Sequence, residues 1–350
     1  MKIGILGLAQ SGKKTVFQLL TQKKIENTHS GNVFEGNAWI RDFRVDRLGD
    51  MYKPQKLKHA EINLALIPAI ETGTCEKSTW PDAARKADAL CFVIRQFPSD
   101  NVFHPSATID PKRDLETIEC EVILSDLILV ERRLERLEKE IRVNKKPEQQ
   151  KLKSVLEKCK EALEDEKYLR SVEFTSEENN LLHSFQFLTM KPCLVVLNTG
   201  EDVPKETALS STRNSQTEVV TVSCQMELEI DALETEEERK LFLEEIGFSK
   251  PAVERLSQAA LELVGMISFF TVGKDEVRAW NVKNGSLAPQ AAGAIHSDLE
   301  RGFIRAEVTK WSDLLEAGSE AKTKELGQTL IKGKDYFVQD GDVFHVRFSV

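Results

Sequence analysis

Long apolar runs and export signals are absent from this sequence of 350 residues. No segment approaches the roughly 20 consecutive apolar residues that a membrane-spanning helix requires. Met1 and Lys2 lead straight into residues 3–6, which have the composition of a buried strand, so there is no room for a signal peptide. We therefore expect a cytoplasmic protein with no membrane partner.

Paired cysteines and metal-binding spacings are also missing. The six cysteines stand singly, without a CxxC pair, which favours reduced thiols and argues against a structural zinc site. The histidines show no metal-binding spacing, and no Ser-His-Asp or Cys-His arrangement can be assembled from sequence spacing alone. The sequence therefore names no metal ligand and no catalytic residue. The cysteines are Cys75, Cys91, Cys120, Cys159, Cys193 and Cys224.

The sequence also lacks an excess of positively charged residues. The formal net charge is −9, which argues against a broad nucleic-acid-binding surface but leaves a local basic patch open. Hydrophobic residues make up 41% of the chain and charged residues 30%, values typical of a globular protein. A chain of this length exceeds one ordinary core, so we expect two or three domains.

What the sequence does contain begins with alternating strand and helix signals. Continuous apolar runs at residues 3–6, 62–67, 89–95 and 193–197 predict strands, and residues 13–21 predict a helix with one apolar face. Apolar strands that alternate with helices indicate a parallel sheet covered on both faces. We therefore expect an α/β domain built around this sheet.

A helical hairpin interrupts that domain. Apolar residues recur at four-three spacing over residues 123–141 and again over residues 152–163, with a polar turn that ends at Pro147 between them. This pattern predicts an antiparallel hairpin with a narrow coiled-coil seam. Charges of both signs cover its outer positions, which are typical of a solvated face, although a binding surface is the alternative.

The carboxy-terminal stretch has a different pattern. Strands are expected at residues 277–282, 304–308 and 342–348, with a helix around residues 295–301 and a turn at residues 336–342. Short strands mixed with a helix predict a small α+β domain.

A phosphate-binding loop lies between the first strand and the first helix. Glycines let the backbone wrap closely around a phosphate, and the amides of the helix amino terminus point at the anion. A lysine at the helix start would reach the terminal phosphates. The alternative is a vestigial loop that no longer binds. The candidate nucleotide-binding residues here are Gly7, Gln10, Ser11, Gly12, Lys13, Lys14 and Thr15.

One position in this loop departs from the motif. The residue after the key lysine should be Ser or Thr, whose hydroxyl binds Mg²⁺, but here it is Lys14. An ammonium group has no lone pair for a metal, and Thr15 faces roughly 100° away on the helix. We expect Lys14 to replace the cation electrostatically, so that nucleotide binds with little need for magnesium.

With these motifs, the chain resembles the Obg-like ATPases, the YchF subfamily of the translation-factor-related P-loop GTPases. The likeness spans almost the whole chain and is densest near the carboxy terminus. Besides the phosphate loop, it rests on residues 110–114 (DPKRD), 130–137 (VERRLERL), 191–193 (KPC), 198–201 (NTGE), 269–273 (FFTVG), 276–280 (EVRAW), 289–293 (PQAAG), 296–298 (HSD), 301–308 (RGFIRAEV), 333–336 (GKDY) and 338–343 (VQDGDV).

The resemblance implies an architecture and a base-reading motif. It implies a P-loop nucleotide-binding domain over residues 1–113 and 186–268, an inserted coiled-coil hairpin over 114–185, and a TGS-like domain of β-grasp type over 269–350. The subfamily carries Asn-x-x-Glu where most relatives read guanine with an Asp, and this goes with a preference for ATP. Asn198 and Glu201 would then contact the base; an ordinary polar pair after a strand is the alternative.

Other motifs implied by the resemblance are lost. The strand end Asp-x-Ala-Gly, which holds the metal through water and senses the γ-phosphate, aligns with Leu66, Ile67, Pro68 and Ala69. The glycine-rich segment that should follow is replaced by the shorter, stiffer residues 72–81, and the first switch threonine falls at Ser30 in an ungapped alignment. Phosphoryl transfer in this class relies on the metal ion, so these losses argue against magnesium and against fast hydrolysis.

Three functions therefore compete. The leading prediction is a protein that binds ATP or GTP, hydrolyses it slowly or not at all, and docks on the ribosome or on RNA through the TGS-like domain and the hairpin. A working ATPase or GTPase, with Thr15 or Ser30 replacing the lost ligands, is the second, and a nucleotide-free scaffold is the third. Residues 274–347 carry 11 basic and 12 acidic residues, so RNA contact by this region would need a local basic patch. The candidate residues for such a patch are Arg278, Lys283, Arg301 and Arg305, and the alternative is that they only keep the surface soluble.

Overall fold

The computed structural model describes residues 1–23, 25, 32–99, 101–144, 146–200, 209, 217–233, 235–245, 248 and 250–349. Contacts divide the chain into two units: unit 1 holds Met1–Ala38 and Asn63–Ala252, and unit 2 holds Trp39–Ile62 and Val253–Val350. Two candidate site residues, Ser30 and Glu201, lie outside the described residues. The division into three domains by residue range stays a prediction.

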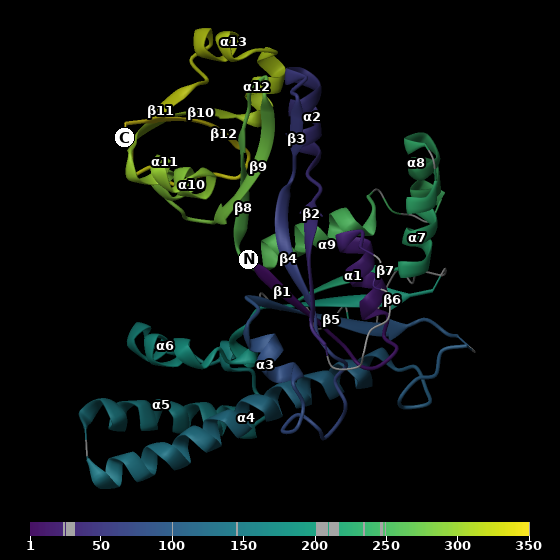
Figure 1. Cartoon of the computed structure of the whole chain (residues 1–350), viewed down its shortest axis with the longest axis vertical. Helices are drawn as coiled ribbons and strands as arrows, with labels where there is room; N and C mark the ends of the chain where they lie inside the picture. Colours follow the sequence, from purple (N-terminus) through teal and green to yellow (C-terminus); the bar gives the residue numbers. More distant parts are fainter. Residues whose placement is uncertain are drawn as a thin grey trace. The chain divides into compact units, whose positions relative to one another are not determined.

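Unit 1 contains a six-stranded sheet in the order β2-β4-β1-β5-β6-β7 (Figure 1). The pairs β4–β1, β1–β5, β5–β6 and β6–β7 are all parallel, as the apolar strands predicted. Its strands are β1 (Lys2–Leu6), β2 (Phe34–Ile40), β4 (Ala60–Leu66), β5 (Ala89–Gln96), β6 (Cys193–Thr199) and β7 (Thr217–Val222), of which β2 and β4 cross the boundary with unit 2.

Helices of unit 1 flank these strands in the sequence. The first, α1 (Lys13–Thr21), buries Val16, Phe17, Leu19 and Leu20, the apolar face that the sequence predicted. The others are α3 (Trp80–Arg85), α4 (Pro111–Val143), α5 (Pro147–Glu164), α6 (Ser176–Leu182), α7 (Cys224–Ala232) and α8 (Glu236–Glu245), with 3-10 turns at Leu169–Ser171, His183–Phe185 and Leu188–Met190.

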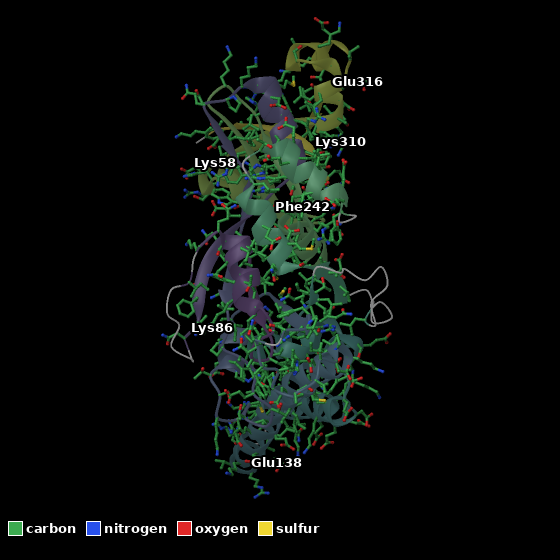
Figure 2. The ribbon with its side chains drawn as sticks, turned by 90° about the vertical axis from the view of Figure 1, so that its right-hand side faces the viewer. Lys58, Lys86, Glu138, Phe242, Lys310 and Glu316 are labelled. Carbon is green, nitrogen blue, oxygen red and sulfur yellow. The ribbon has the colours of Figure 1, made fainter. Side chains whose placement is uncertain are left out.

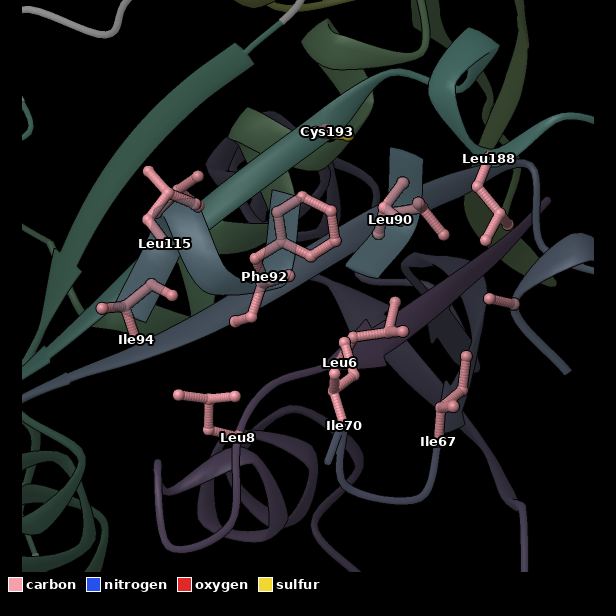
Figure 3. Close-up of a cluster of buried hydrophobic side chains, with 14 of the residues drawn as sticks. Leu6, Leu8, Ile67, Ile70, Leu90, Phe92, Ile94, Leu115, Leu188 and Cys193 are labelled. Carbon is pink, nitrogen blue, oxygen red and sulfur yellow. The ribbon is translucent and has the colours of Figure 1, made fainter. Parts of the chain in front are cut away.

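The main core of unit 1 is formed where the strands meet α4 and α3. Figure 3 shows Leu6, Phe92 and Ile94 from the strands with Leu115 from the start of α4. Phe92 is fully buried, and the same cluster takes in Cys75 from the segment between β4 and α3 and Trp80 from the start of α3. This core fixes the strand ends from which the phosphate loop and that segment leave.

The predicted hairpin is confirmed as α4 and α5, which run side by side (Figure 1). Its seam contains every apolar residue of the predicted pattern, including the fully buried Val130, Leu137 and Leu156. Ion pairs Lys153–Glu138 at 3.0 Å and Lys160–Glu131 at 2.9 Å cross between the helices. Figure 2 labels Glu138 among the charged side chains that project from the hairpin.

Asp126 anchors α4 to the rest of unit 1. Its fully buried carboxylate accepts hydrogen bonds from the backbone N–H groups of Leu188 at 3.1 Å and Thr189 at 2.8 Å. The Thr189 hydroxyl donates to it at 2.7 Å and the Arg85 guanidinium at 2.6 Å. A buried carboxylate that is paired on all sides in this way fixes the base of the hairpin.

Unit 2 contains a second six-stranded sheet, in the order β11-β10-β12-β8-β9-β3. This mixed sheet and its helices confirm the predicted α+β region. Its elements are α2 (Phe43–Tyr52), β3 (Lys56–Lys58), α9 (Ala252–Leu263), β8 (Met266–Thr271), β9 (Glu276–Lys283), α10 (Ala288–Ile295), α11 (Ser297–Arg301), β10 (Phe303–Lys310), α12 (Trp311–Ala317), α13 (Glu320–Glu325), β11 (Leu330–Lys332) and β12 (Asp342–Phe348).

The helix predicted around residues 295–301 is in fact the second of two. A first helix, α10, ends at Ile295, and His296 then adopts an extended conformation that separates it from α11. The His296 ring accepts a hydrogen bond from the Asp298 N–H at 3.2 Å and so caps α11. His296 thus has a structural role at the start of α11.

Residues from the amino-terminal half of the chain complete unit 2. Strand β3 pairs in parallel with β9, and α2 carries Arg44, which binds Asp42 and Asp340 and lies over the Phe270 ring at 5.0 Å. Phe43 meets Trp311 edge to face at 5.5 Å. The unit therefore includes Trp39–Ile62 as well as the carboxy-terminal region.

Candidate phosphate-binding cleft

The predicted phosphate loop connects β1 to α1. Gly12 caps α1 with a φ of 93°, a conformation that favours glycine. A Cβ at Gly12 would come within 2.1 Å of the Asn198 Nδ2 atom, and one at Gly7 would lie 2.7 Å from the Val93 carbonyl oxygen. Both glycines are therefore required by close packing, and the loop has the tight wrap that brings backbone amides toward an anion.

Two lysines open α1, and no acidic residue lies in its first turn. Positive charge at a helix amino terminus is unfavourable, because the helix dipole already places positive charge there. Lys13 is only 7% exposed, and its Nζ atom donates a long hydrogen bond of 3.5 Å to the Leu8 carbonyl. Burial, and then the charge of Lys14, lower the pKa of Lys13 to about 8. An anion in the loop would relieve this concentration of positive charge.

A cleft of about 770 Å³ opens in front of the loop. This volume suits a small-molecule ligand. The cleft combines the phosphate loop with the end of β4 and the segment that follows it. Its lining residues are Ala9, Gln10, Ser11, Gly12, Lys13, Lys14, Thr15, Asn32, Phe34, Leu66, Ile67, Pro68, Ala69, Glu71, Lys77, Ser78, Thr79 and Trp80.

The cleft brings together six of the predicted site residues, those from Gln10 to Thr15. Gly7 lies at the start of the loop, where its carbonyl oxygen accepts a hydrogen bond from the Ile70 N–H at 3.1 Å. The hydroxyl of Ser11 is buried and has no hydrogen-bond partner among the described residues. A buried donor without a partner is costly, so this hydroxyl is available to a ligand oxygen.

Asn198 lies outside the cleft lining, at the end of β6. It is 3% exposed, and its Nδ2 atom donates to the Ser11 carbonyl at 3.1 Å, while its Oδ1 atom accepts from the Cys224 N–H at 3.3 Å. Asn198 thus holds the phosphate loop against the start of α7. Beyond these two hydrogen bonds the amide has capacity for one more N–H donation and one more accepted bond, which would allow contact with a base. Base contact by Asn198 stays a prediction.

The described residues of the cleft do not fit a magnesium site of the expected kind. Lys14 stands in place of the loop hydroxyl, and Leu66 is a buried apolar residue in place of the carboxylate at the strand end. No group of three His, Cys, Asp or Glu side chains gathers in the described part of the chain in a way that could hold a metal ion. Thr15 and Glu71 are the oxygen-bearing side chains of the lining nearest in sequence to those two positions.

Sequence reasoning missed the contribution of the segment between β4 and α3. Glu71, Lys77, Ser78 and Thr79 of this segment line the cleft together with Trp80 at the start of α3, whereas the sequence indicated only a segment that is shorter and stiffer than the glycine-rich one it replaces. A turn that contains one lysine shows no periodic pattern by which a binding role could be recognised. The one signal in the sequence is the position of this segment, after the strand end that aligns with the γ-phosphate sensor.

The carboxy-terminal residues 266–349 match the family YchF-GTPase_C, described as a protein of unknown function (DUF933). The chain is 39% identical over 367 residues to the "Ribosome-binding ATPase YchF" of Bacillus subtilis, covering 99% of both sequences. It is 36% identical over 362 residues to the "Ribosome-binding ATPase YchF" of Haemophilus influenzae, covering 100% of this chain and 99% of the relative. The solved "Structure of the Schizosaccharomyces pombe YchF GTPase" matches with a TM-score of 0.84 and 26% identity, over 99% of this chain and 97% of that one.

Proposed function

Because the chain belongs to the YchF family, we propose that it binds a purine nucleotide, ATP or GTP, and acts in association with the ribosome. The observation that carries the nucleotide proposal is the cleft in front of the phosphate loop. Two lysines and a glycine with positive φ converge there without an acidic residue in the first helical turn, and with them a serine hydroxyl that has no hydrogen-bond partner in the described part of the chain. This arrangement is complementary to an anion such as a polyphosphate.

The protein then hydrolyses its bound nucleotide slowly or not at all. Phosphoryl transfer in P-loop enzymes needs a metal ion to hold and neutralise the β and γ oxygens. Lys14 and Leu66 occupy the two positions from which the chain would hold that ion, and this supports slow or absent hydrolysis of a nucleotide that still binds. Lys14 supplies part of the missing positive charge.

Calorimetry with ATP and with GTP, each in magnesium and in a chelator, tests this proposal. We expect one nucleotide to bind in both conditions, and the Lys13→Ala variant to bind neither. Binding that is lost on chelation would contradict the metal-independent site. Failure of both nucleotides in both conditions would contradict nucleotide binding altogether and favour the scaffold function.

An active ATPase or GTPase is a second candidate, because Glu71 and Thr15 bring oxygen atoms into the cleft lining and the relatives are named as ATPases. Steady phosphate release that disappears in the Lys13→Ala variant would support it. Release that is unchanged in that variant would point to a contaminating enzyme. The Glu71→Gln variant separates a role in hydrolysis from a role in binding.

The ribosome enters as a partner because two relatives are named ribosome-binding, and this supports the predicted cytoplasmic location. No helix among the described residues is long and apolar enough to cross a membrane. For RNA contact in unit 2, Lys283 and Arg305 are exposed, whereas Arg301 is paired with Asp298 and the Arg278 guanidinium lies over the Trp280 ring. Cosedimentation with ribosomes should weaken in the Lys283→Ala and Arg305→Ala variants if these side chains contact RNA.

A further inference from the structure

The segment from Glu71 to Trp80 contributes five residues to the phosphate-binding cleft, and one of them is a third lysine. Lys77 is exposed, and no ion pair or hydrogen bond of its ammonium group is found in the described part of the chain. Among the described residues, the cleft lining therefore carries the charges of Lys13, Lys14 and Lys77 against the carboxylate of Glu71. An excess of positive charge in one cleft favours a polyanionic ligand.

The backbone around Lys77 is held in a fixed turn. The N–H groups of Lys77 and Ser78 donate to the Thr74 carbonyl oxygen at 2.9 and 3.0 Å, and the hydroxyls of Thr74 and Ser78 lie 2.9 Å apart. Cys75 and Trp80, on either side of Lys77, are both buried in the unit 1 core. Lys77 is therefore presented to the cleft by an ordered element, so little backbone entropy is lost when it binds a ligand.

A second attachment ties this turn to the helical hairpin. The Glu121 carboxylate on α4 accepts a hydrogen bond from the Gly73 N–H at 2.6 Å, and Arg132 on the same helix pairs with Glu76. Both contacts act on the turn within a few residues of Lys77. The position of the lysine relative to the loop is thus set by unit 1 itself.

We propose that Lys77 binds the terminal phosphate of a nucleoside triphosphate and supplies positive charge that the chain cannot obtain from a protein-held magnesium ion. The loop backbone would cradle the inner phosphates and Lys13 would reach toward the terminal ones from the loop side, whereas Lys77 comes from the segment after the strand end that aligns with the γ-phosphate sensor. Lys77 should therefore distinguish triphosphate from diphosphate. This inference rests on the proposed nucleotide-binding function and adds the residue that reads the third phosphate.

Calorimetric titrations of the full chain in a chelator, with ATP and ADP and with GTP and GDP, test the inference. The Lys77→Ala variant should bind the triphosphate about tenfold more weakly than the wild type, the loss expected for one charge-assisted contact. Its affinity for the diphosphate should stay within about twofold of the wild type. Lys77→Arg should keep most of the triphosphate affinity, and Lys86→Ala, which removes an exposed lysine outside the cleft lining, should behave as wild type.

Equal losses for triphosphate and diphosphate in Lys77→Ala, or no loss for either, would overturn the inference and leave the nucleotide-binding proposal intact. A wild-type protein that binds none of the four nucleotides would overturn both. Melting curves of the variants without nucleotide control for folding, and they should match because Lys77 is exposed.

Discussion

The side-chain amide of Asn198 donates to the backbone carbonyl of Ser11 at 3.1 Å and accepts from the backbone N–H of Cys224 at 3.3 Å. One side chain thus connects the phosphate loop to the strand that follows the hairpin and to the start of α7. The contact explains why Gly12 tolerates no Cβ, because the Asn198 amide fills that space.

Replacing Asn198 by Ala should destabilise the protein by about 1–3 kcal/mol, because two buried backbone groups lose their partner. Urea unfolding of the variant measures this change. Asn180→Ala, at an exposed position of α6, is the matched control and should change the free energy of unfolding by less than about 0.5 kcal/mol. An Asn198→Ala protein as stable as the control would mean that the contact contributes nothing to folding.

Nucleotide affinity should fall as the pH rises above about 8. The pKa of Lys13 is lowered to about 8, so in the free protein the ammonium loses its proton there and with it the attraction for phosphate. Bound phosphate favours the protonated form and raises the pKa of Lys13 in the complex. Affinity is therefore highest below the pKa of the free protein and declines as the pH rises above that value. The other charged groups of the lining that belong to described residues are Lys14, Lys77 and Glu71.

Calorimetry between about pH 7 and 9.5 checks this pH dependence. In Lys14→Ala the decline should begin at a higher pH, because Lys14 is one of the two causes that lower the pKa of Lys13. An affinity that is constant across this range, or that rises with pH, would contradict the assignment of Lys13 as the titrating phosphate ligand.

Removing the carboxylate of Asp126 should loosen the base of the hairpin. Asp126→Ala leaves the Leu188 and Thr189 amides and the Arg85 guanidinium without their buried acceptor, so we expect a loss of about 3 kcal/mol in the free energy of unfolding. Glu138→Gln breaks the exposed pair with Lys153 and should cause no measurable change. Similar unfolding curves for the two variants would refute the anchoring role.

Arg44→Lys should destabilise unit 2 by about 1–2 kcal/mol. A lysine cannot reproduce the paired contacts to Asp42, the contact to Asp340 and the stacking over Phe270 at the same time. Arg47→Lys, at an exposed position of the same helix, is the control and should leave thermal unfolding unchanged. Equal melting temperatures for the two variants would show that Arg44 acts as an ordinary surface residue.

The features that the sequence predicted are those whose physics is local. The phosphate loop is a run of nine residues between a strand and a helix, and the hairpin seam repeats every three or four residues, so each carries its own signal. The place of Trp39–Ile62 in unit 2 could not be predicted, because β3 is three residues long and pairs with a strand far along the chain. Lys77 likewise became a candidate only when its turn was found on the cleft.

The pairing of β3 with β9 also imposes an order on folding. Lys56 and Leu57 pair with Glu276 and Val277. These two residues are synthesised early and can pair with their native partners only after most of the chain has been made. Contacts at such long sequence separation slow folding, and an unpaired strand invites wrong pairing in the meantime. A fragment limited to residues 266–349 would lack β3 and α2, hence the carboxy-terminal region cannot be excised with its sheet complete.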